Sequence, residues 1–210
     1  MARYAISDIH GCPRTFSRLL ERIGLRTSDQ LFLLGDYIDR GPDSFGVLRM
    51  IWKMVHDGFP VVCLRGNHEQ MLLDALGSAN TPWDYRPHRR NRDDVERWID
   101  ALPYYYETPG YLLVHAGLNF GVDDPLGDTD SMLWARHWED EIDRNWLSDR
   151  IVLYGHTPAT RTTVAENVVH MRRTGRACID SGCAMSVAGM GYLTAVNLDS
   201  GEAVFEKRRD

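Results

Sequence analysis

The sequence predicts an α/β fold in which buried strands carry polar side chains to one shared edge. A short apolar run bounded by turn residues is typical of a buried strand. Such runs occur at residues 4–6, 31–34, 61–64, 112–114, 151–153 and 177–179. Each run ends in polar residues and glycine, and residues 13–23 and 43–56 follow two of them with helical patterning. These observations predict strand and helix units that alternate in the first half of the chain.

Each of these two helices carries its own signals. Residues 13–23 begin with a proline, whose fixed φ suits a first helical turn, and Gly24 follows the last residue. Along residues 43–56 the apolar side chains recur at helical spacing, and Asp43 suits the N-cap. Asp8 could cap the first helix, which is the structural alternative to a chemical role for this residue.

The second half of the chain predicts more strand than helix. Residues 93–102 predict a helix, whereas residues 168–170, 177–180, 192–198 and 203–206 are short segments of strand character. The chain has 210 residues, 43% of them hydrophobic, and shows no repeat or Gly/Ser/Pro linker. We therefore expect one domain over residues 1–210.

The charge and the termini limit the class of function. A formal net charge of −6 argues against extended nucleic-acid binding and against attraction to an anionic membrane. The N-terminus MARYAISDIHG has no apolar signal region, and no run reaches the roughly 20 apolar residues that span a bilayer. We expect a cytoplasmic protein. The four cysteines lack CxxC spacing, which predicts reduced, packed thiols at Cys12, Cys63, Cys178 and Cys183.

The polar residues after the strands form a candidate metal site. The carboxyl ends of strands in an α/β sheet mark the ligand-binding edge, so these motifs are expected to converge. Asp8 and His10 are two residues apart, and in an extended segment their side chains would point the same way. Asp36 follows the next strand and can bridge a second ion with its two carboxylate oxygens.

Three further candidates complete a mixed donor set. Asn67 adds a neutral oxygen, and His115 and His156 add imidazoles. Oxygen and nitrogen donors without thiolate suit Mn, Fe or Zn better than an all-oxygen calcium site. Two such ions a few ångströms apart activate a water and neutralise charge in an in-line displacement at phosphorus. Taken alone, Asn67 could equally be a turn residue.

Other residues of the motifs have roles in the same chemistry. His68, beside Asn67, can donate a proton to a leaving oxygen, and Asp39 can orient it. Arg40 and Arg136 offer forked donors to phosphate oxygens. Arg136 alone could also be an ordinary solvated helix charge.

The motifs DIHG, GDYIDRG, RGNHEQM, HAG, GHTP and IDSG occur in this order along the chain. In sequence and order they resemble the phosphoprotein phosphatase family of the calcineurin-like metallophosphoesterases. The resemblance implies a four-layer αββα sandwich with its metal site at the carboxyl ends of the strands. It implies that one metal takes Asp8, His10 and Asp36, and the other Asp36, Asn67, His115 and His156.

The resemblance also implies a mechanism. A hydroxide that bridges the metals attacks phosphorus directly, without a phosphoenzyme. His68 with Asp39 assists the leaving group, while Arg40 and Arg136 bind the phosphoryl oxygens. Manganese is the expected metal, and iron or zinc would also fit.

The sequence motifs RGNHEQM and LWARHW and the short chain make this protein most similar to the small bacterial and phage branch of that family. This branch contains serine/threonine protein phosphatases and, nearby, symmetrical diadenosine tetraphosphatases. We expect hydrolysis of phosphoserine or phosphothreonine in proteins, or of a phosphorylated small molecule, with no obligatory regulatory subunit. The alternative is a symmetrical diadenosine tetraphosphate hydrolase. A metal-bearing module without turnover is disfavoured because it would not need His68, Asp39 and both arginines.

Substrate choice is tied to residues 81–92, TPWDYRPHRRNR. Four arginines lie there beside Trp83 and Tyr85, which predicts either a rim that stacks on a nucleobase and gathers polyphosphate or one that steers a phosphopeptide. A solvated loop is the structural alternative.

Overall fold

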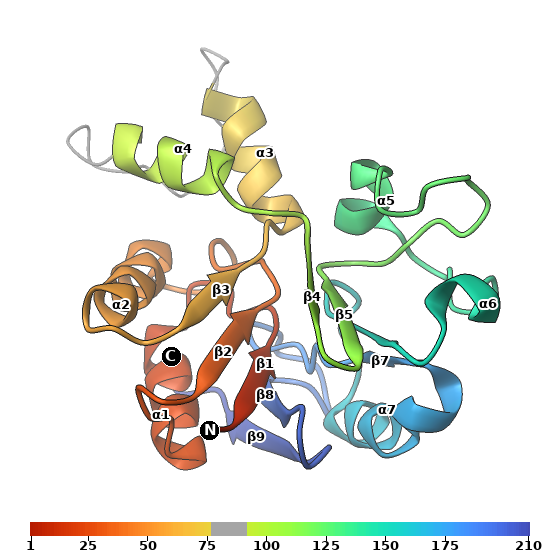
Figure 1. Cartoon of the computed structure of the whole chain (residues 1–210). Helices are drawn as coiled ribbons and strands as arrows, with labels where there is room; N and C mark the ends of the chain where they lie inside the picture. Colours follow the sequence, from red (N-terminus) through yellow and green to blue (C-terminus); the bar gives the residue numbers. More distant parts are fainter. Residues whose placement is uncertain (77–91) are drawn as a thin grey trace.

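The protein is described by a computed structural model, which covers residues 1–76 and 92–210 (Figure 1). Its centre consists of two sheets, of five and four strands. The first has the order β3-β2-β1-β8-β9, with bounds Val61–Cys63, Gln30–Leu33, Arg3–Ile6, Tyr192–Asn197 and Ala203–Lys207. The second has the order β4-β5-β6-β7, with bounds Tyr105–Thr108, Tyr111–Val114, Ile151–Tyr154 and Arg176–Cys178.

The strands that precede the polar motifs run parallel within each sheet. In the first sheet Ile6 pairs with Leu33, and Leu33 pairs with Cys63, so β1, β2 and β3 end level with one another. In the second sheet β5, β6 and β7 are parallel in the same way. The polar loops after these strands therefore leave from the carboxyl edges of both sheets.

Seven helices are described around the two sheets (Figure 1). They are α1 (Pro13–Ile23), α2 (Ser44–His56), α3 (Asn67–Leu76), α4 (Arg92–Asp100), α5 (Thr129–Trp134), α6 (Arg144–Leu147) and α7 (Arg161–Thr174). Side chains of α1 and α2 pack on the outer face of the first sheet, and α5 and α6 contribute to the cluster on the outer face of the second. The predicted αββα arrangement is confirmed.

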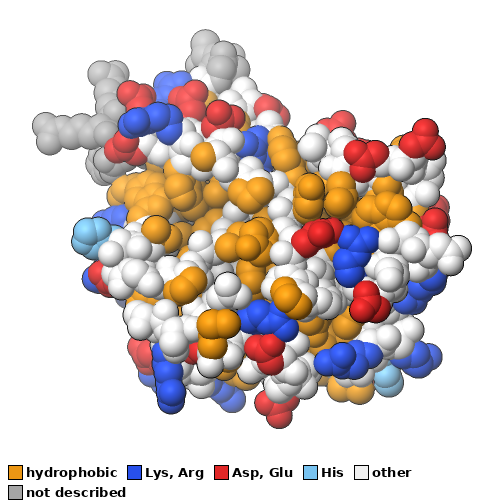
Figure 2. Space-filling view, in the orientation of Figure 1, with side chains coloured by type: hydrophobic (Ala, Val, Ile, Leu, Met, Phe, Trp, Pro, Cys, Tyr) orange, Lys and Arg blue, Asp and Glu red, His pale blue; other side chains and the backbone are white. Residues whose placement is uncertain are grey.

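Strand alternation divides the core into three clusters. Leu113 and Leu153 face inward, where they meet Phe32 of the first sheet in the layer between the sheets. Leu112 and Val152, one residue earlier, face the outer cluster with α5 and α6. Because successive strand residues point to opposite faces, β5 and β6 are buried on both sides. Surface charges of both signs are interspersed with apolar side chains on the face shown in Figure 2.

The helix predictions in the first half are confirmed. Pro13 opens α1, and Gly24 ends it in the left-handed conformation with φ 60°. The Asp43 side chain caps α2 by accepting a hydrogen bond from the Gly46 amide at 2.7 Å. The N-cap of α1 is Cys12, so Asp8 does not cap this helix.

The prediction of a strand at residues 168–170 is wrong. These residues lie within α7, which Thr160 caps at its start and Gly175 ends. Val164, Val168 and Met171 are buried at helical spacing against the layer between the sheets. That packing outweighs the local preference of two adjacent valines for a strand. With α5, α6 and α7, the second half holds more helix than its sequence suggests.

Three further predictions bear on the fold. All four cysteines are free thiols. Within the described ranges 1–76 and 92–210, no helix combines the length and apolarity needed to cross a bilayer. The proposed substrate rim at residues 81–92 lies outside the described residues except for Arg92, which opens α4.

Candidate active site

Polar loops from both sheets meet at the carboxyl edge of the strands. Asp8 and His10 follow β1, and Asp36 follows β2. Three residues after β3 the chain enters α3, so Asn67 and His68 occupy its first turn. His115 follows β5 and His156 follows β6. All seven side chains belong to buried residues, which is unusual for charged and polar groups and calls for partners.

The backbone at these positions is in a costly conformation. Positive φ angles occur at Asp8, His10, Asp36, Asp39, Arg40 and His156, between 37° and 67°. Residues other than glycine seldom adopt this left-handed region, and each instance costs about 1 to 3 kcal/mol. Strained residues of this kind are concentrated at functional sites, where the surrounding structure holds them in place. Here the strain falls on six of the ten residues predicted from the sequence to form the site.

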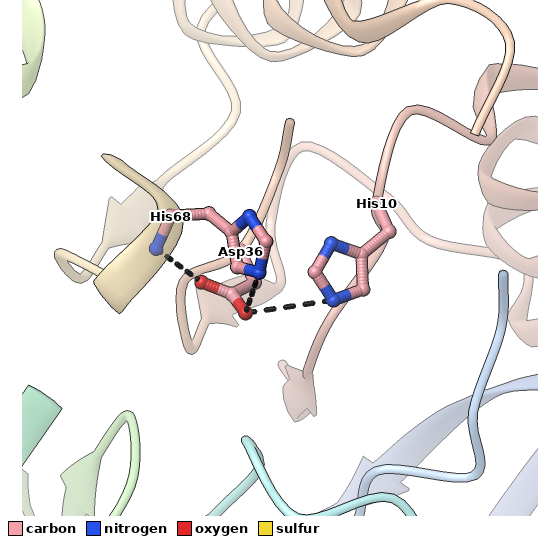
Figure 3. A group of neighbouring side chains, drawn as sticks. All are labelled: His10, Asp36 and His68. Atoms are coloured by element: carbon pink, nitrogen blue, oxygen red, sulfur yellow. Dashed lines mark hydrogen bonds and ion pairs between the residues drawn. The ribbon is translucent and has the colours of Figure 1, made fainter. Parts of the chain in front are cut away.

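Asp36 lies at the centre of the site. In Figure 3 its carboxylate lies between the imidazoles of His10 and His68. The Oδ2 atom is 3.5 Å from His10 Nε2 and 3.9 Å from His68 Nε2, while Oδ1 is 3.5 Å from His115 Nε2. Two groups of potential ligands share Asp36: one with His10 and His68, the other with His115 and His156. Within each group the ligand atoms lie within 4.8 Å of one another.

Backbone carbonyls fix the orientation of two imidazoles. His10 Nδ1 lies 2.9 Å from the Ile38 carbonyl oxygen, and His115 Nδ1 lies 2.9 Å from the Leu34 carbonyl oxygen. Because a carbonyl accepts only, each Nδ1 carries the proton and each Nε2 presents its lone pair to Asp36. Burial lowers the pKa of His10 to about 4 and also lowers the pKa of His115. Both rings are therefore neutral at pH 7, the form that binds metals.

The second group converges on Asn67. Its Oδ1 lies 2.9 Å from His115 Nε2 and 2.9 Å from His156 Nδ1. Burial lowers the pKa of His156 to about 3, and its Nε2 is buried without a hydrogen-bond partner among the described residues. The amide oxygen of Asn67 and one nitrogen from each imidazole therefore lie close together and form a site that fits a divalent cation.

Asp8 belongs to neither group of potential ligands found among the described residues, and its backbone differs from the prediction. The expected extended segment is wrong, because φ is 37° at Asp8 and 46° at His10. The Asp8 carboxylate accepts a hydrogen bond from the His156 amide, with oxygens at 3.1 and 3.2 Å. A Cβ atom at Gly155 would overlap this carboxylate, so only glycine fits there. Burial raises the pKa of Asp8 well above its usual range, and the charges of Asp180 and Asp36 add to the effect.

His68 has the surroundings of a proton donor. Its Nδ1 lies 2.6 Å from Asp39 Oδ2, and its Nε2 lies 3.2 Å from Nη2 of Arg40. The His68 amide also donates to Asp36 Oδ1 at 3.0 Å, which ties the ring to the centre. Burial opposes the charged ring, but the hydrogen bond to Asp39 and the charge of Asp36 outweigh it and raise the pKa of His68.

Arg136 stands at the margin of the site. It follows α5 by two residues and is exposed, with no hydrogen bond or ion pair to the described part of the chain. After burial and the neighbouring His115, its positive charge contributes to the lowered pKa of His156. The charge of Arg136 therefore acts on the centre, and its exposed guanidinium group can bind an anion.

Two buried carboxylates that lacked assigned roles in the sequence belong to the site as well. Glu69 is fully buried and accepts hydrogen bonds from the amides of Asp36, Tyr37 and Gly66 at 2.8, 2.8 and 3.0 Å. Asp180 follows β7, and burial raises its pKa to about 7. For Glu69 the available signal was its place in RGNHEQM, two residues after Asn67, and for Asp180 it was the motif IDSG at the end of a predicted strand.

The comparisons with known proteins agree with this geometry. The calcineurin-like phosphoesterase family matches residues 1–185. A protein from Aromatoleum aromaticum named "Bis(5'-nucleosyl)-tetraphosphatase, symmetrical" is 37% identical over 125 residues, 56% of this chain and 45% of that protein. A protein of the same name from Acidovorax sp. strain JS42 is 32% identical over 178 residues, 75% of this chain and 58% of that protein.

Solved structures share the fold over the whole chain. A provisionally named diadenosine tetraphosphatase superposes with a TM-score of 0.71 at 21% identity, covering 100% of this chain and 95% of that one. A serine/threonine phosphatase from Saccharomyces cerevisiae, similar to human PP5, gives 0.67 at 18% identity, covering 98% and 79%. At these identities the likeness shows the fold alone.

The relatives correct the predicted activity. The expectation of a serine/threonine protein phosphatase is contradicted, because curated relatives at 32 to 40% identity are named symmetrical bis(5'-nucleosyl)-tetraphosphatases. They favour the alternative prediction instead. The alignments with these relatives cover 43 to 58% of their length, so the chain spans about half of each. The match over residues 1–185 shows that the chain belongs to the calcineurin-like phosphoesterases, a family of metal-dependent hydrolases.

Proposed function

We propose that this protein hydrolyses dinucleoside tetraphosphates symmetrically, so that each substrate yields two nucleoside diphosphates. The named relatives support the substrate class. The single structural observation that supports the chemistry is the pair of buried donor groups that share Asp36. Two cations side by side suit a substrate whose reacting phosphates carry several negative charges.

In this proposal one cation would be held by Asp8, His10 and Asp36, and His68, the third member of the first donor group, is assigned to the leaving group. The other would be held by Asp36, Asn67, His115 and His156, and manganese is the expected metal. When bound, the ions supply Lewis acidity and lower the pKa of a coordinated water. The neutral imidazoles, the shared carboxylate and the Nε2 of His156, which has no hydrogen-bond partner in residues 1–76 and 92–210, support this assignment.

The remaining residues act on the phosphates directly. Arg40 and Arg136 bind phosphoryl oxygens, since both guanidinium groups are exposed near the centre. In its charged form His68 donates from Nδ1 to Asp39 and carries on Nε2 the proton that the leaving oxygen would take. Asp39 fixes the ring and stabilises its charged form.

The leaving group affects how much His68 contributes. A nucleoside diphosphate departs through a phosphate whose second pKa is about 6. Its negative charge is therefore tolerated at neutral pH far better than that of a serine alkoxide. General-acid assistance is needed less for the anhydride than for a phosphoserine ester.

The test compares two substrates on the manganese-loaded protein. We expect kcat/KM to be much larger for diadenosine tetraphosphate than for a phosphothreonine peptide, with ADP as the only nucleotide product. Chromatography separates ADP from the ATP and AMP that asymmetrical cleavage would give. ATP and AMP in equal amounts, or a preference for the peptide, would refute the proposal. Val169→Ala serves as an active control, because Val169 is 74% exposed on α7.

A further inference from the structure

Trp134 has a large aromatic side chain that is exposed to solvent at the edge of the site. It is the last residue of α5, seen in Figure 1 above α6, and it is 44% exposed. The two residues before it, Met132 and Leu133, are 0% and 3% exposed. The helix therefore buries its apolar side and leaves the indole outside the core.

The position of this indole is fixed relative to the site. The Ala116 amide, one residue after His115, donates to the Met132 carbonyl oxygen at 2.8 Å, which ties α5 to a loop of the site. Asp128 caps the helix by accepting from the Ser131 amide at 3.0 Å. The Trp134 ring lies 6.4 Å from the His156 ring, centroid to centroid, at an interplanar angle of 89°. It also precedes Arg136 by two residues.

We infer that Trp134 stacks on one nucleobase of the substrate. The inference rests on the proposed function, since it assigns a binding surface to the nucleoside part of that substrate. An exposed indole beside a cation-binding imidazole and an open arginine suits a ligand that joins an aromatic base to a polyphosphate. Aromatic side chains stack on any base, which agrees with relatives named for nucleosides in general.

A second aromatic surface lies nearby and provides the competing location. A cavity of about 500 Å³ beside β4 is lined by Tyr104, Tyr105, Tyr106, Leu126 and Thr129, among others. Apolar side chains gather over β4 on the face shown in Figure 2. Trp134 is the better location because it contacts a predicted metal ligand, whereas none of the residues that line the cavity is a predicted ligand or phosphate-binding residue.

The experiment separates the base from the phosphates. Calorimetric titration of the manganese-loaded protein with ADP and with inorganic pyrophosphate gives two dissociation constants, and only ADP carries a base. Stacking on a base changes affinity by about tenfold or more. We expect Trp134→Leu to weaken ADP binding about tenfold and pyrophosphate binding less than twofold. Trp134→Phe, which keeps an aromatic face, should recover most of the ADP affinity.

Several results would overturn the inference. Equal weakening of ADP and pyrophosphate by Trp134→Leu would mean that the indole only positions Arg136. Loss of ADP affinity in Tyr105→Leu but not in Trp134→Leu would move the base to the cavity. Unchanged ADP binding in every variant would mean that the base contacts neither Trp134 nor the cavity beside β4. Thermal melting checks that each variant is folded.

The proposed function fails in a different way. If the wild-type protein does not cleave diadenosine tetraphosphate, the activity assignment is wrong whatever Trp134 does. If it cleaves this substrate and Trp134→Leu binds ADP as tightly as the wild type, only the inference about Trp134 is wrong.

Discussion

The two ends of the parallel strands handle charge in opposite ways. At the amino end, Arg3 donates to the Asp199 carboxylate at 2.7 and 2.9 Å and to the Pro109 carbonyl oxygen at 2.9 Å. The turn after β8 and the turn between β4 and β5 are thereby joined across the two sheets. The carboxylate is paired and its side chain is 43% exposed, so water also stabilises it. At this amino end, which we call the relaxed end, the charges are paired and partly solvated.

The carboxyl end concentrates carboxylates away from water. Asp8, Asp36, Glu69 and Asp180 are all buried there, and burial raises the pKa of Glu69 to about 8 and of Asp180 to about 7. Positive φ angles add backbone strain. Groups arranged at a cost to stability are expected where they serve binding or catalysis. We therefore expect bound cations to stabilise the carboxyl end of the parallel strands and to leave the amino end unaffected.

The largest effect is expected from Asp36→Asn, because both donor groups share this carboxylate. Loss of several kcal/mol of charge stabilisation corresponds to a decrease of about 10³-fold or more in kcat/KM. In the wild type, Mn²⁺ at 100 times its dissociation constant adds about 2.7 kcal/mol to the free energy of unfolding. Thermal melts with and without Mn²⁺ measure this stabilisation, which Asp36→Asn should lose and Asp199→Asn should keep.

A chelator should abolish wild-type activity, and chelator-resistant hydrolysis would contradict the metal assignment.

His68→Asn is expected to have the next largest effect. General acid catalysis contributes about 10²- to 10⁴-fold, and the loss should lie near the lower end for a nucleoside diphosphate leaving group. Metal content, measured by elemental analysis, should stay at the wild-type level because His68 is assigned to the leaving group. A variant with unchanged turnover would remove His68 from the role of general acid.

Glu69→Gln tests whether the strained end depends on its buried carboxylate. Three backbone amides donate to Glu69, and an amide side chain offers only one acceptor oxygen. An amide left unpaired in the interior costs about 1 to 3 kcal/mol, so the free energy of unfolding should fall by that amount. Urea titration measures it, with the exposed Glu166→Gln on α7 as the control. Equal stability of the two variants would show that Glu69 does not hold these loops.

The sequence predicts what is encoded locally. The strands of the first sheet, α1 and α2 follow from apolar spacing and caps, and the loops of the site follow from the polar and glycine residues after each strand. The side chains of Asp36, Asn67, His68, His115 and His156 do converge, because parallel strands end at one edge.

Features imposed by distant contacts could not be predicted in this way. The positive φ at His10 accompanies a hydrogen bond from its amide to the Asp36 carbonyl oxygen at 2.9 Å. The role of Glu69 depends on amides more than 30 residues earlier in the chain, at Asp36 and Tyr37. Residues 168–170 form helix because Val168 packs with Val164 and Met171, which the two adjacent valines alone do not indicate.

The smallest effect is expected at the relaxed end, from Asp199→Asn. Partial burial opposes the charge of Asp199, but the hydrogen bonds from Arg3 outweigh it and lower the pKa of this carboxyl below 3.8. The pair therefore stabilises the fold fully above pH 3.8, and its contribution is lost as the pH falls through the lowered pKa. Because the pair is partly exposed, the variant should lose no more than about 1 kcal/mol at pH 7. Urea titrations of both proteins at pH 7 and in acid should show this difference shrinking. A loss that persists undiminished in acid would mean that Asp199 acts through packing, and the contrast between the two ends would no longer be one of charge.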